Sequence, residues 1–244
     1  MRPAVYPVVY LIVILLGCSS EDAAICDSNS VDIGHGSCIV FTNGETLGER
    51  QDAITAKARE AVALVNEIMP VEEIKITVRA SAQNAIPEIG VGGYNPDRNE
   101  VIISFDPNFP DLDQTIEEEL AFQFAHEMHH AKRRRAVGYG STLLQAAVSE
   151  GLADCFAEEV TNKSPSPWSL ALTGDDLDLW LANAMDVWNE SGYDHAQWFL
   201  GSTQDIPRWT GYAIGYKLVK DFIMANPDRK ASDLFDEPAS SFEP

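Results

Sequence analysis

Basic residues are scarce in this sequence. Its 244 residues include 17 Lys and Arg against 38 Asp and Glu, which gives a formal net charge of −21 at pH 7. Nucleic acids and anionic lipid head groups attract proteins through positive charge, so the composition argues against both as electrostatic partners. The acidity mainly favours solubility, and attraction of basic substrates is the alternative.

Internal repeats and low-complexity blocks are also absent. Apolar residues make up 45% of the chain and charged residues 23%. This composition is enough to bury one sizeable core, and two full domains are not the default at this length. The sequence therefore predicts one globular domain.

Long apolar runs are missing as well. The run from Val8 to Leu16 follows Arg2 and is too brief to span a bilayer. A short basic start followed by such a run is typical of a signal peptide, which we place at residues 1–17.

The end of this segment, Leu-Leu-Gly-Cys-Ser-Ser at residues 15–20, resembles the bacterial lipobox. The resemblance implies a lipid anchor on Cys18 and, from Ser19, sorting to the outer membrane if the bacterium has one. Leu16 is unusual before the glycine, so ordinary secretion and an uncleaved anchor remain alternatives.

With Cys18 assigned to the anchor, three cysteines remain. Cys26 and Cys38 flank an eleven-residue polar segment, and in an oxidising compartment they could form a local disulfide. Cys155 is left over. It lies in a predicted helix beside Phe156, where we expect a buried, inert thiol rather than a nucleophile.

Polar residues dominate the segment at 18–46, which has no sustained periodicity. This composition predicts a tether that carries the domain away from the membrane, with plain disorder as the alternative. The folded domain is then expected at residues 47–244.

Two periodicities indicate the fold class of that domain. Between Glu49 and Met69, apolar residues recur at helical spacing, and they are Ile54, Ala58, Ala61, Val62 and Val65. Residues 74–78 alternate between apolar and polar, and residues 101–105 form a second β-rich run. We therefore predict an α+β fold with a small antiparallel sheet, whose edge could accept an extended peptide as a further strand.

Histidine is also rare, yet three of the five histidines lie in the stretch His126-Glu127-Met128-His129-His130. On a helix, His126 and His130 lie one turn apart on the same face, where both can bind one metal ion with Glu127 beside it. Thr115 and Glu118 form a possible capping box, and the apolar residues after it recur at i+4 spacing. The motif is therefore expected on a helix.

A catalytic zinc ion usually has three protein ligands, so a third is required. Glu150 is the leading candidate, because Thr142 and Gln145 can cap a second helix that a glycine-containing turn folds back against the first. Asp154 lies one turn beyond Glu150 and could accept the outer ring N–H of a ligating histidine.

This spacing resembles the Glu-zincins, the thermolysin-like metallopeptidases. Together with Ser-Glu-Gly-Leu-Ala-Asp at 149–154 and Thr-Gly-Tyr-Ala-Ile-Gly-Tyr at 210–216, it resembles a bacterial family of predicted zinc-dependent proteases, over roughly residues 60–235. The resemblance implies an α+β zincin fold and peptidase activity with one zinc ion per chain.

The resemblance also implies a donor that stabilises the tetrahedral oxyanion, which related Glu-zincins supply from a Tyr or His. Tyr212 and Tyr216 are the first candidates, followed by His195 and Arg208. Core packing is the alternative role for the two tyrosines. His129 is expected to pack or hydrogen-bond beside the site, although its position would also allow it to compete as a ligand.

A basic cluster, Lys132-Arg133-Arg134-Arg135, ends the expected motif helix. Cations at a helix C-terminus are stabilised by the helix dipole, which is the preferred interpretation. A clamp for a substrate carboxylate is the alternative.

These observations predict a membrane-tethered zinc metalloendopeptidase of the cell envelope, a monomer that acts on peptide or protein substrates and binds no nucleic acid. A lipoprotein that binds zinc without catalysis and acts through partners is the alternative, and hydrolysis of a non-peptide amide is a third. The presence of Glu127 favours an enzyme, because a structural zinc site needs no general base.

Overall fold

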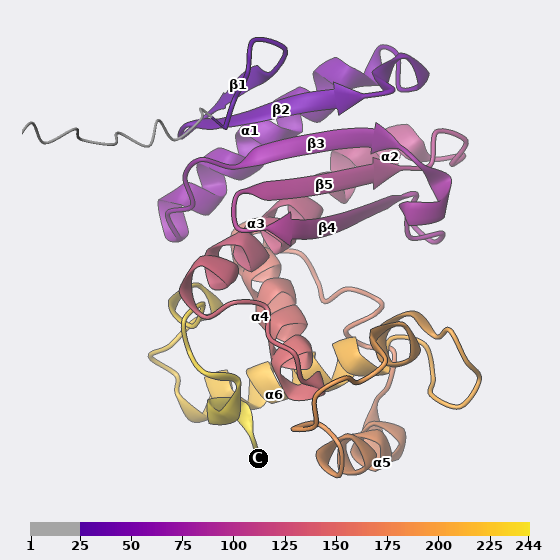
Figure 1. Ribbon diagram of the computed structural model, residues 1–244, viewed down its shortest axis with the longest axis vertical. Coiled ribbons are helices and arrows are strands. Elements are labelled where there is room, and N and C mark those ends of the chain that lie inside the picture. Colours follow the sequence, from indigo (N-terminus) through magenta and orange to yellow (C-terminus); the bar gives the residue numbers. More distant parts are fainter. Residues whose placement is uncertain (1–24) are drawn as a thin grey trace, which may run out of the picture.

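The computed structural model describes residues 25–244, so the expected signal peptide and Cys18 lie outside the described residues. The fold is α+β (Figure 1). The strands are β1 (Val31–Gly34), β2 (Ser37–Thr42), β3 (Lys75–Ala80), β4 (Val91–Asp97) and β5 (Glu100–Phe105). The α-helices are α1 (Arg50–Ile68), α2 (Leu112–Glu118), α3 (Leu120–Ala136), α4 (Leu143–Thr161), α5 (Gly174–Met185) and α6 (Thr210–Ala225). Among the described residues, no helix is both long enough and apolar enough to cross a bilayer.

Short helical turns complete the architecture. Four are 3₁₀ turns, η1 (Gly44–Thr46), η2 (Ala82–Asn84), η4 (Ala231–Asp233) and η5 (Ala239–Phe242), and η3 (Ala196–Leu200) is a π-helical turn. Of these, η2 and η3 contribute residues to the cleft described below.

The sheet has the strand order β1-β2-β3-β5-β4. Strands β2, β3 and β5 run parallel, and only the edge strands β1 and β4 are antiparallel to their neighbours. The prediction of an antiparallel sheet is therefore wrong for the three central strands. Strands β2 and β3 are parallel because the helical crossover α1 connects them, and β5 is parallel to β3 because the chain first passes to the edge strand β4 and then returns as β5.

The first two strands lie within the segment expected to be a tether. Residues 31–42 differ from that prediction because Ile33 and Ile39 are buried in the core, while the polar residues between them form a turn. A disulfide joins Cys26 to Cys38 at the start of β2, with a Cα–Cα distance of 5.8 Å. The folded domain therefore begins before residue 47.

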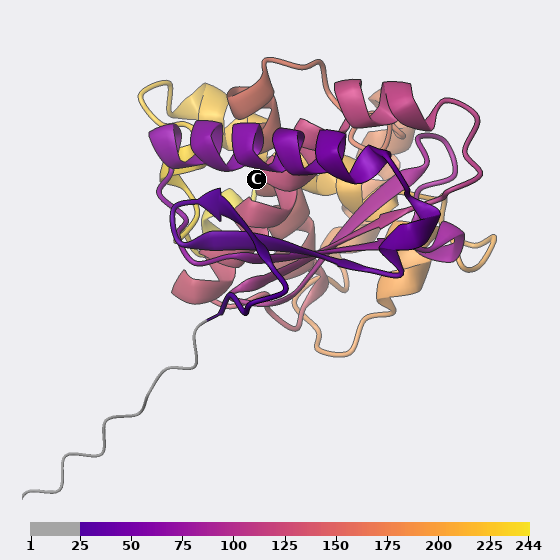
Figure 2. The same cartoon turned by 90° about the horizontal axis from the view of Figure 1, so that it is seen from above.

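Helix α1 lies along one face of the sheet (Figure 2). Its predicted apolar face is confirmed, since each of the residues on which the prediction was based is fully buried: Ile54, Ala58, Ala61, Val62 and Val65. This helix therefore anchors the sheet to the core.

The residues that were expected to form one helix, from Thr115 through the histidine motif, form two helices. Thr115 does not cap a helix as predicted; it lies inside α2 and its hydroxyl donates to the Ile89 carbonyl at 2.7 Å. Helix α3 then begins at Leu120 and carries the whole histidine motif.

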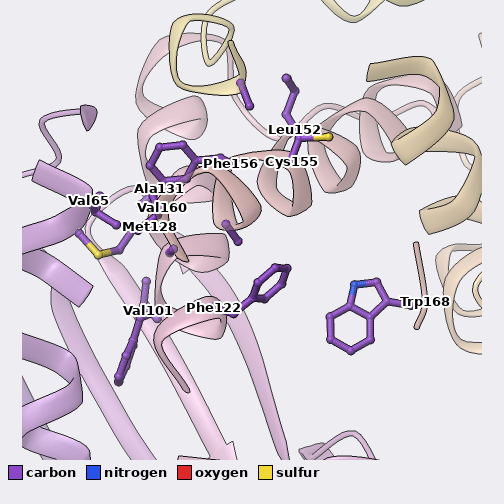
Figure 3. Packing of buried hydrophobic residues seen from close by; sticks show 14 of the residues in the cluster. Val65, Val101, Phe122, Met128, Ala131, Leu152, Cys155, Phe156, Val160 and Trp168 are labelled. Carbon is purple, nitrogen blue, oxygen red and sulfur yellow. The ribbon is translucent and has the colours of Figure 1, made fainter. Parts of the chain in front are cut away.

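Helix α4 is the centre of the C-terminal half and is buried along most of its length. Side chains of α3 and α4 meet in one core, in which Met128 and Ala131 lie near Phe156 and Val160 (Figure 3). The predicted capping box of α4 is confirmed, because Thr142 accepts from the Gln145 backbone and the Gln145 side chain accepts from the Thr142 backbone.

The basic cluster at the end of α3 joins distant parts of the chain. Each of its four side chains donates to a backbone carbonyl of another segment. The acceptors are Pro70 for Lys132, Phe235 and Glu237 for Arg133, Asn95 for Arg134, and Glu72, Glu73 and Arg98 for Arg135. The cluster therefore ties the sheet and the C-terminal segment to the motif helix, a role beyond the predicted interaction with the helix dipole.

Glycines allow α4 and α6 to cross at backbone contact. A Cβ on Gly151 would collide with the Gly215 carbonyl, and a Cβ on Gly215 would collide with the backbone of Ala147. The two glycines occur in the two motifs at 149–154 and 210–216, so these motifs meet in the fold.

We expect Gly215→Ala to lower the free energy of unfolding by about 3 kcal/mol, because helix backbones cannot yield as a flexible side chain can. Helix propensity alone predicts the opposite sign, a gain of about 1 kcal/mol. Urea unfolding measures the change. As a control, Met224→Ala on the exposed face of α6 should stay within about 0.5 kcal/mol of the unsubstituted protein, and a stabilising Gly215→Ala would refute the backbone contact.

Candidate metal centre and cleft

Three side chains from α3 and α4 converge on one point. The Nε2 atoms of His126 and His130 are 3.0 Å apart, and each lies 3.2 Å from Oε2 of Glu150. All three side chains are buried, and their ligand atoms lie within 4.8 Å of one another. The structure thus brings together the three residues that the sequence selected as metal ligands.

The turn between α3 and α4 makes this convergence possible. Gly138 and Gly140 adopt φ values of +80° and +95°, a region that L side chains rarely occupy. A Cβ at Gly140 would also collide with the side chain of Gln145, which caps α4. The turn therefore reverses the chain within a few residues and sets α4 against α3.

Asp154 orients the first histidine. Its carboxylate accepts from His126 Nδ1 at 2.8 Å, from Trp168 Nε1 at 3.0 Å and from Ser169 Oγ at 2.6 Å. A carboxylate only accepts, so Nδ1 of His126 carries a proton, and Nε2 is the ring nitrogen left to bind a metal ion.

Two neighbours support the other ligands. Ser149 Oγ lies 3.3 Å from His130 Nδ1, and the Tyr139 hydroxyl donates to Glu150 Oε1 at 2.7 Å. This leaves Oε2 of Glu150 directed at the histidines. Tyr139 and Trp168 were missed as site residues because each lies outside the motifs; the only sequence signal is that Tyr139 stands between the two turn glycines.

The charges of this cluster are strongly coupled. Burial acts to lower the pKa of His126, but hydrogen bonds to Asp154 and Glu150 outweigh it and hold this pKa well above its usual value. Burial acts to raise the pKa of Glu150, but His130 and His126 outweigh it and hold this pKa well below its usual value. The metal-free site therefore favours the protonated ring of His126, and a metal ion must displace the proton from Nε2 to bind there.

Glu127 lies beside the cluster, against the edge strand β4. A Cβ on Gly93 would collide with the Glu127 carboxyl group, so a side chain at this position of β4 would displace the carboxylate. Glu127 is buried and its Oε2 has no hydrogen-bond partner. Burial raises the pKa of Glu127, while His126 and His130 lower it by less, which brings the carboxylate closer to the range in which a general base works.

The residues present fit a metal ion. Two imidazole nitrogens and one carboxylate oxygen form the donor set typical of a catalytic zinc site with one open position. The open side faces a cleft of about 720 Å³, which is lined by residues of β4, α3, α4 and α6. The unpartnered Glu127 carboxylate also lines this cleft.

His129 of the motif and Cys155 of α4 lie outside the cluster of His126, His130 and Glu150. His129 is fully buried and its ring packs against Phe156 with the ring centroids 5.3 Å apart. It lines no part of the cleft, so its place is in the core. Cys155 is also buried, and burial raises the pKa of its thiol well above the usual value, which makes it unreactive.

Of the predicted oxyanion donors, Tyr212, His195 and Arg208 line the cleft, whereas Tyr216 does not. The Tyr216 ring lies over Lys220, 5.2 Å from its Nζ. Burial and then Glu150 raise the pKa of Tyr212 well above its usual value, so its hydroxyl stays protonated and can donate.

His195 is held by a group of aromatic rings. Its ring stacks on Phe199 at 4.4 Å, and its Nδ1 lies 3.0 Å from the Tyr193 hydroxyl. Gly211 permits this arrangement, because a Cβ there would meet the Phe199 ring. The first glycine of the 210–216 motif therefore supports the cleft wall, and the second supports the contact with α4.

Comparison with known proteins agrees with the arrangement of the site. No curated protein and no solved structure matches the chain in these comparisons. Residues 54–243, most of the chain, match the family described as "Predicted Zn-dependent protease (DUF2268)". The matched region contains both helices of the His126, His130 and Glu150 cluster and the whole wall of the cleft formed by α6. The chain therefore belongs to this family of predicted zinc-dependent proteases.

Proposed function

We propose that this protein is a zinc metalloendopeptidase of the bacterial cell envelope with an α+β zincin fold. The observation that carries the proposal is the position of Glu127, a buried carboxylate without a hydrogen-bond partner, beside a His-His-Glu cluster at an open cleft. A zinc ion held by His126, His130 and Glu150 would supply Lewis acidity and lower the pKa of a water molecule.

The chain's own residues then perform the proton transfers and hold the ligands. Asp154 keeps His126 in the tautomer that binds metal, and Tyr139 orients Glu150. Glu127 takes a proton from the attacking water and delivers it to the leaving amine. The Tyr212 hydroxyl, or the His195 ring held by Tyr193, donates to the oxyanion that develops on the scissile carbonyl.

The edge strand β4 supports an endopeptidase. Strand β4 ends the sheet, and Ile86 already bridges its outer edge at Val91, so an extended peptide can pair with the part of that edge that follows, at Gly93 and Tyr94. Gly93 of this strand lies against Glu127. A peptide bound along the edge would pass the general base at a bond within its length rather than at its end.

The envelope location rests on the N-terminal sequence and is supported by the disulfide. From the lipobox-like segment we propose a lipid anchor at Cys18. It would hold the protein on the periplasmic side of an outer membrane or on the outer surface of a single membrane. The Cys26–Cys38 disulfide suits an oxidising compartment outside the cytoplasm. We propose that the enzyme acts there as a monomer on peptide or protein substrates.

A zinc-binding lipoprotein without catalysis is the competing function. A structural zinc ion is usually enclosed by four protein ligands, whereas this cluster has three that face a cleft. A structural zinc ion also needs no buried carboxylate without a hydrogen-bond partner beside it, such as Glu127, which favours the enzyme.

Glu127→Gln should lower the rate of peptide cleavage by a factor of about 100 or more, because the amide cannot take a proton from water. Bound zinc should remain at one ion per chain, since Glu127 is not a ligand. Zinc analysis and cleavage of a peptide library by both proteins test this. A wild-type protein that binds zinc yet cleaves no peptide, or a Glu127→Gln variant as active as wild type, would refute the peptidase.

Asp154→Ala should weaken zinc binding by about 10- to 100-fold, because His126 loses the partner that sets its tautomer. Glu150→Ala should weaken binding further, because it removes a ligand. Competition with a chelating dye measures both affinities. Glu158→Gln is the matched control, since this residue lies one turn beyond Asp154 on α4, pairs with Lys220 and should leave zinc affinity unchanged; equal losses in all three variants would exclude the assigned roles.

Tyr212→Phe should lower kcat by about 100-fold while KM changes little, because the oxyanion exists only in the transition state. Tyr216→Phe, one turn along the same helix and outside the cleft, should change kcat by no more than a few-fold. If Tyr212→Phe keeps its kcat and His195→Gln loses it, the donor is His195.

A further inference from the structure

We infer that Arg134 selects substrates that carry an Asp or Glu side chain close to the scissile bond. This inference rests on the proposed peptidase function and adds the substrate class. It concerns a side chain of the basic cluster at the end of α3, whose other members have structural partners elsewhere.

Arg134 follows the two histidine ligands on the same face of α3. His126, His130 and Arg134 are spaced at four residues, so they form one stripe along the helix, and all three line the cleft. The guanidinium also lies over the ring of Tyr139, 5.4 Å from its centroid, and Tyr139 in turn holds Glu150. Arg134 therefore stands one helical turn from His130 and two turns from His126.

The position of the guanidinium is set by the edge strand. Its Nε donates to Asn95 Oδ1 at 2.9 Å, and its Nη2 donates to the Asn95 carbonyl at 2.8 Å. Asn95 is itself buried and held by its Nδ2, which donates to the carbonyls of Asp97 and Glu100. Within residues 25–244, these hydrogen bonds leave Nη1 of Arg134 without a protein partner, so its donors are available to a ligand in the cleft.

The charges around the cleft distinguish Arg134 from the other arginines there. Arg208 is already paired with Glu88 at 2.6 Å, whereas Arg134 forms no ion pair within the described part of the chain. Arg79 lies on β3, two strands from the edge, with its Nε bonded to Ser104. Of the arginines in the described lining of the cleft, Arg134 is therefore the one that lies on the helix of the two histidines and has no carboxylate partner.

Carboxylates that could neutralise Arg134 are rare in the cleft, although the protein is strongly acidic. The described lining contains two, Glu127 and Glu150. Glu150 is held by the two histidines and by Tyr139, and Glu127 faces Gly93. A substrate carboxylate can therefore bind the free side of Arg134 without competing with a carboxylate of the protein.

A peptide with Glu should bind more tightly than the same peptide with Gln by about tenfold or more, since a hydrogen bond between charged partners exceeds one to a neutral amide. The negative charge of the rest of the surface repels both the approach and the binding of acidic peptides. At physiological salt this repulsion is screened beyond about 8 Å, so the local contact with Arg134 should dominate the preference.

The test uses binding, so that it does not depend on turnover. Zinc-loaded Glu127→Gln protein is titrated at pH 7 and physiological salt with two fluorescein-labelled peptide libraries. The libraries are identical except that one position, moved along the peptide, is fixed as Glu in one and as Gln in the other. Fluorescence anisotropy gives the ratio of the two affinities at each position.

We expect one or two adjacent positions to favour Glu by about tenfold, and the ratio to fall towards 1 when Arg134→Gln is added. Arg134→Lys should keep an intermediate ratio, because it retains the charge but not the geometry set by Asn95. Arg135→Gln is the matched control. This neighbouring arginine binds backbone carbonyls outside the cleft, so its loss should leave the ratio as it was.

Equal affinities for the Glu and Gln libraries at every position, absence of binding by either library, or a Glu preference that survives Arg134→Gln would each overturn the inference. Zinc content and thermal unfolding of the variants exclude misfolding as the cause of a lost preference. Failure of the proposed function has a different outcome, in which zinc-loaded wild type cleaves neither library while Glu127→Gln still prefers Glu through Arg134.

Discussion

The packing of α4 between α3 and α6 is the contact on which the rest of the site depends. Glu150 and Asp154, one turn apart on α4, both contact His126 of α3. A small shift of α4 would therefore move both carboxylates away from this histidine. On its other side α4 meets α6 at backbone contact through Gly151 and Gly215. Close packing of this kind does not deform continuously, which holds the cluster at a single geometry.

The end of α3 connects this helical half to the sheet. Lys132, Arg133 and Arg135 donate to carbonyls of segments that are distant in the sequence, and Arg134 donates to the edge strand. The same helix therefore carries the two histidines of the candidate metal centre and, at its C-terminal end, the side chains that bind the other segments of the domain. This arrangement fixes β4 next to Glu127, so the strand that would bind a peptide and the base that would act on it move together.

Local patterns predicted several parts of this structure correctly. The buried face of α1 followed from helical spacing, and the start of α4 followed from Thr142 and Gln145, because both depend on residues within one or two turns. The parallel central strands and the strands at 31–42 did not follow, because strand order depends on pairing between distant segments. The polar residues around His35 indicated a tether, whereas burial of Ile33 and Ile39 made the segment part of the sheet.

By itself, the sequence determined that His126 and His130 share one face, since spacing of four on a helix brings two side chains together, and it indicated Glu150 and Asp154 through the same rule on the next helix. Only the tertiary structure decided which tyrosine faces the cleft. Tyr212 and Tyr216 lie on nearly the same face of α6, but Tyr212 lines the cleft, whereas Tyr216 packs against Lys220. Tyr139, Trp168 and the free side of Arg134 were likewise decided by tertiary contacts, because their partners come from separate elements whose approach no local pattern encodes.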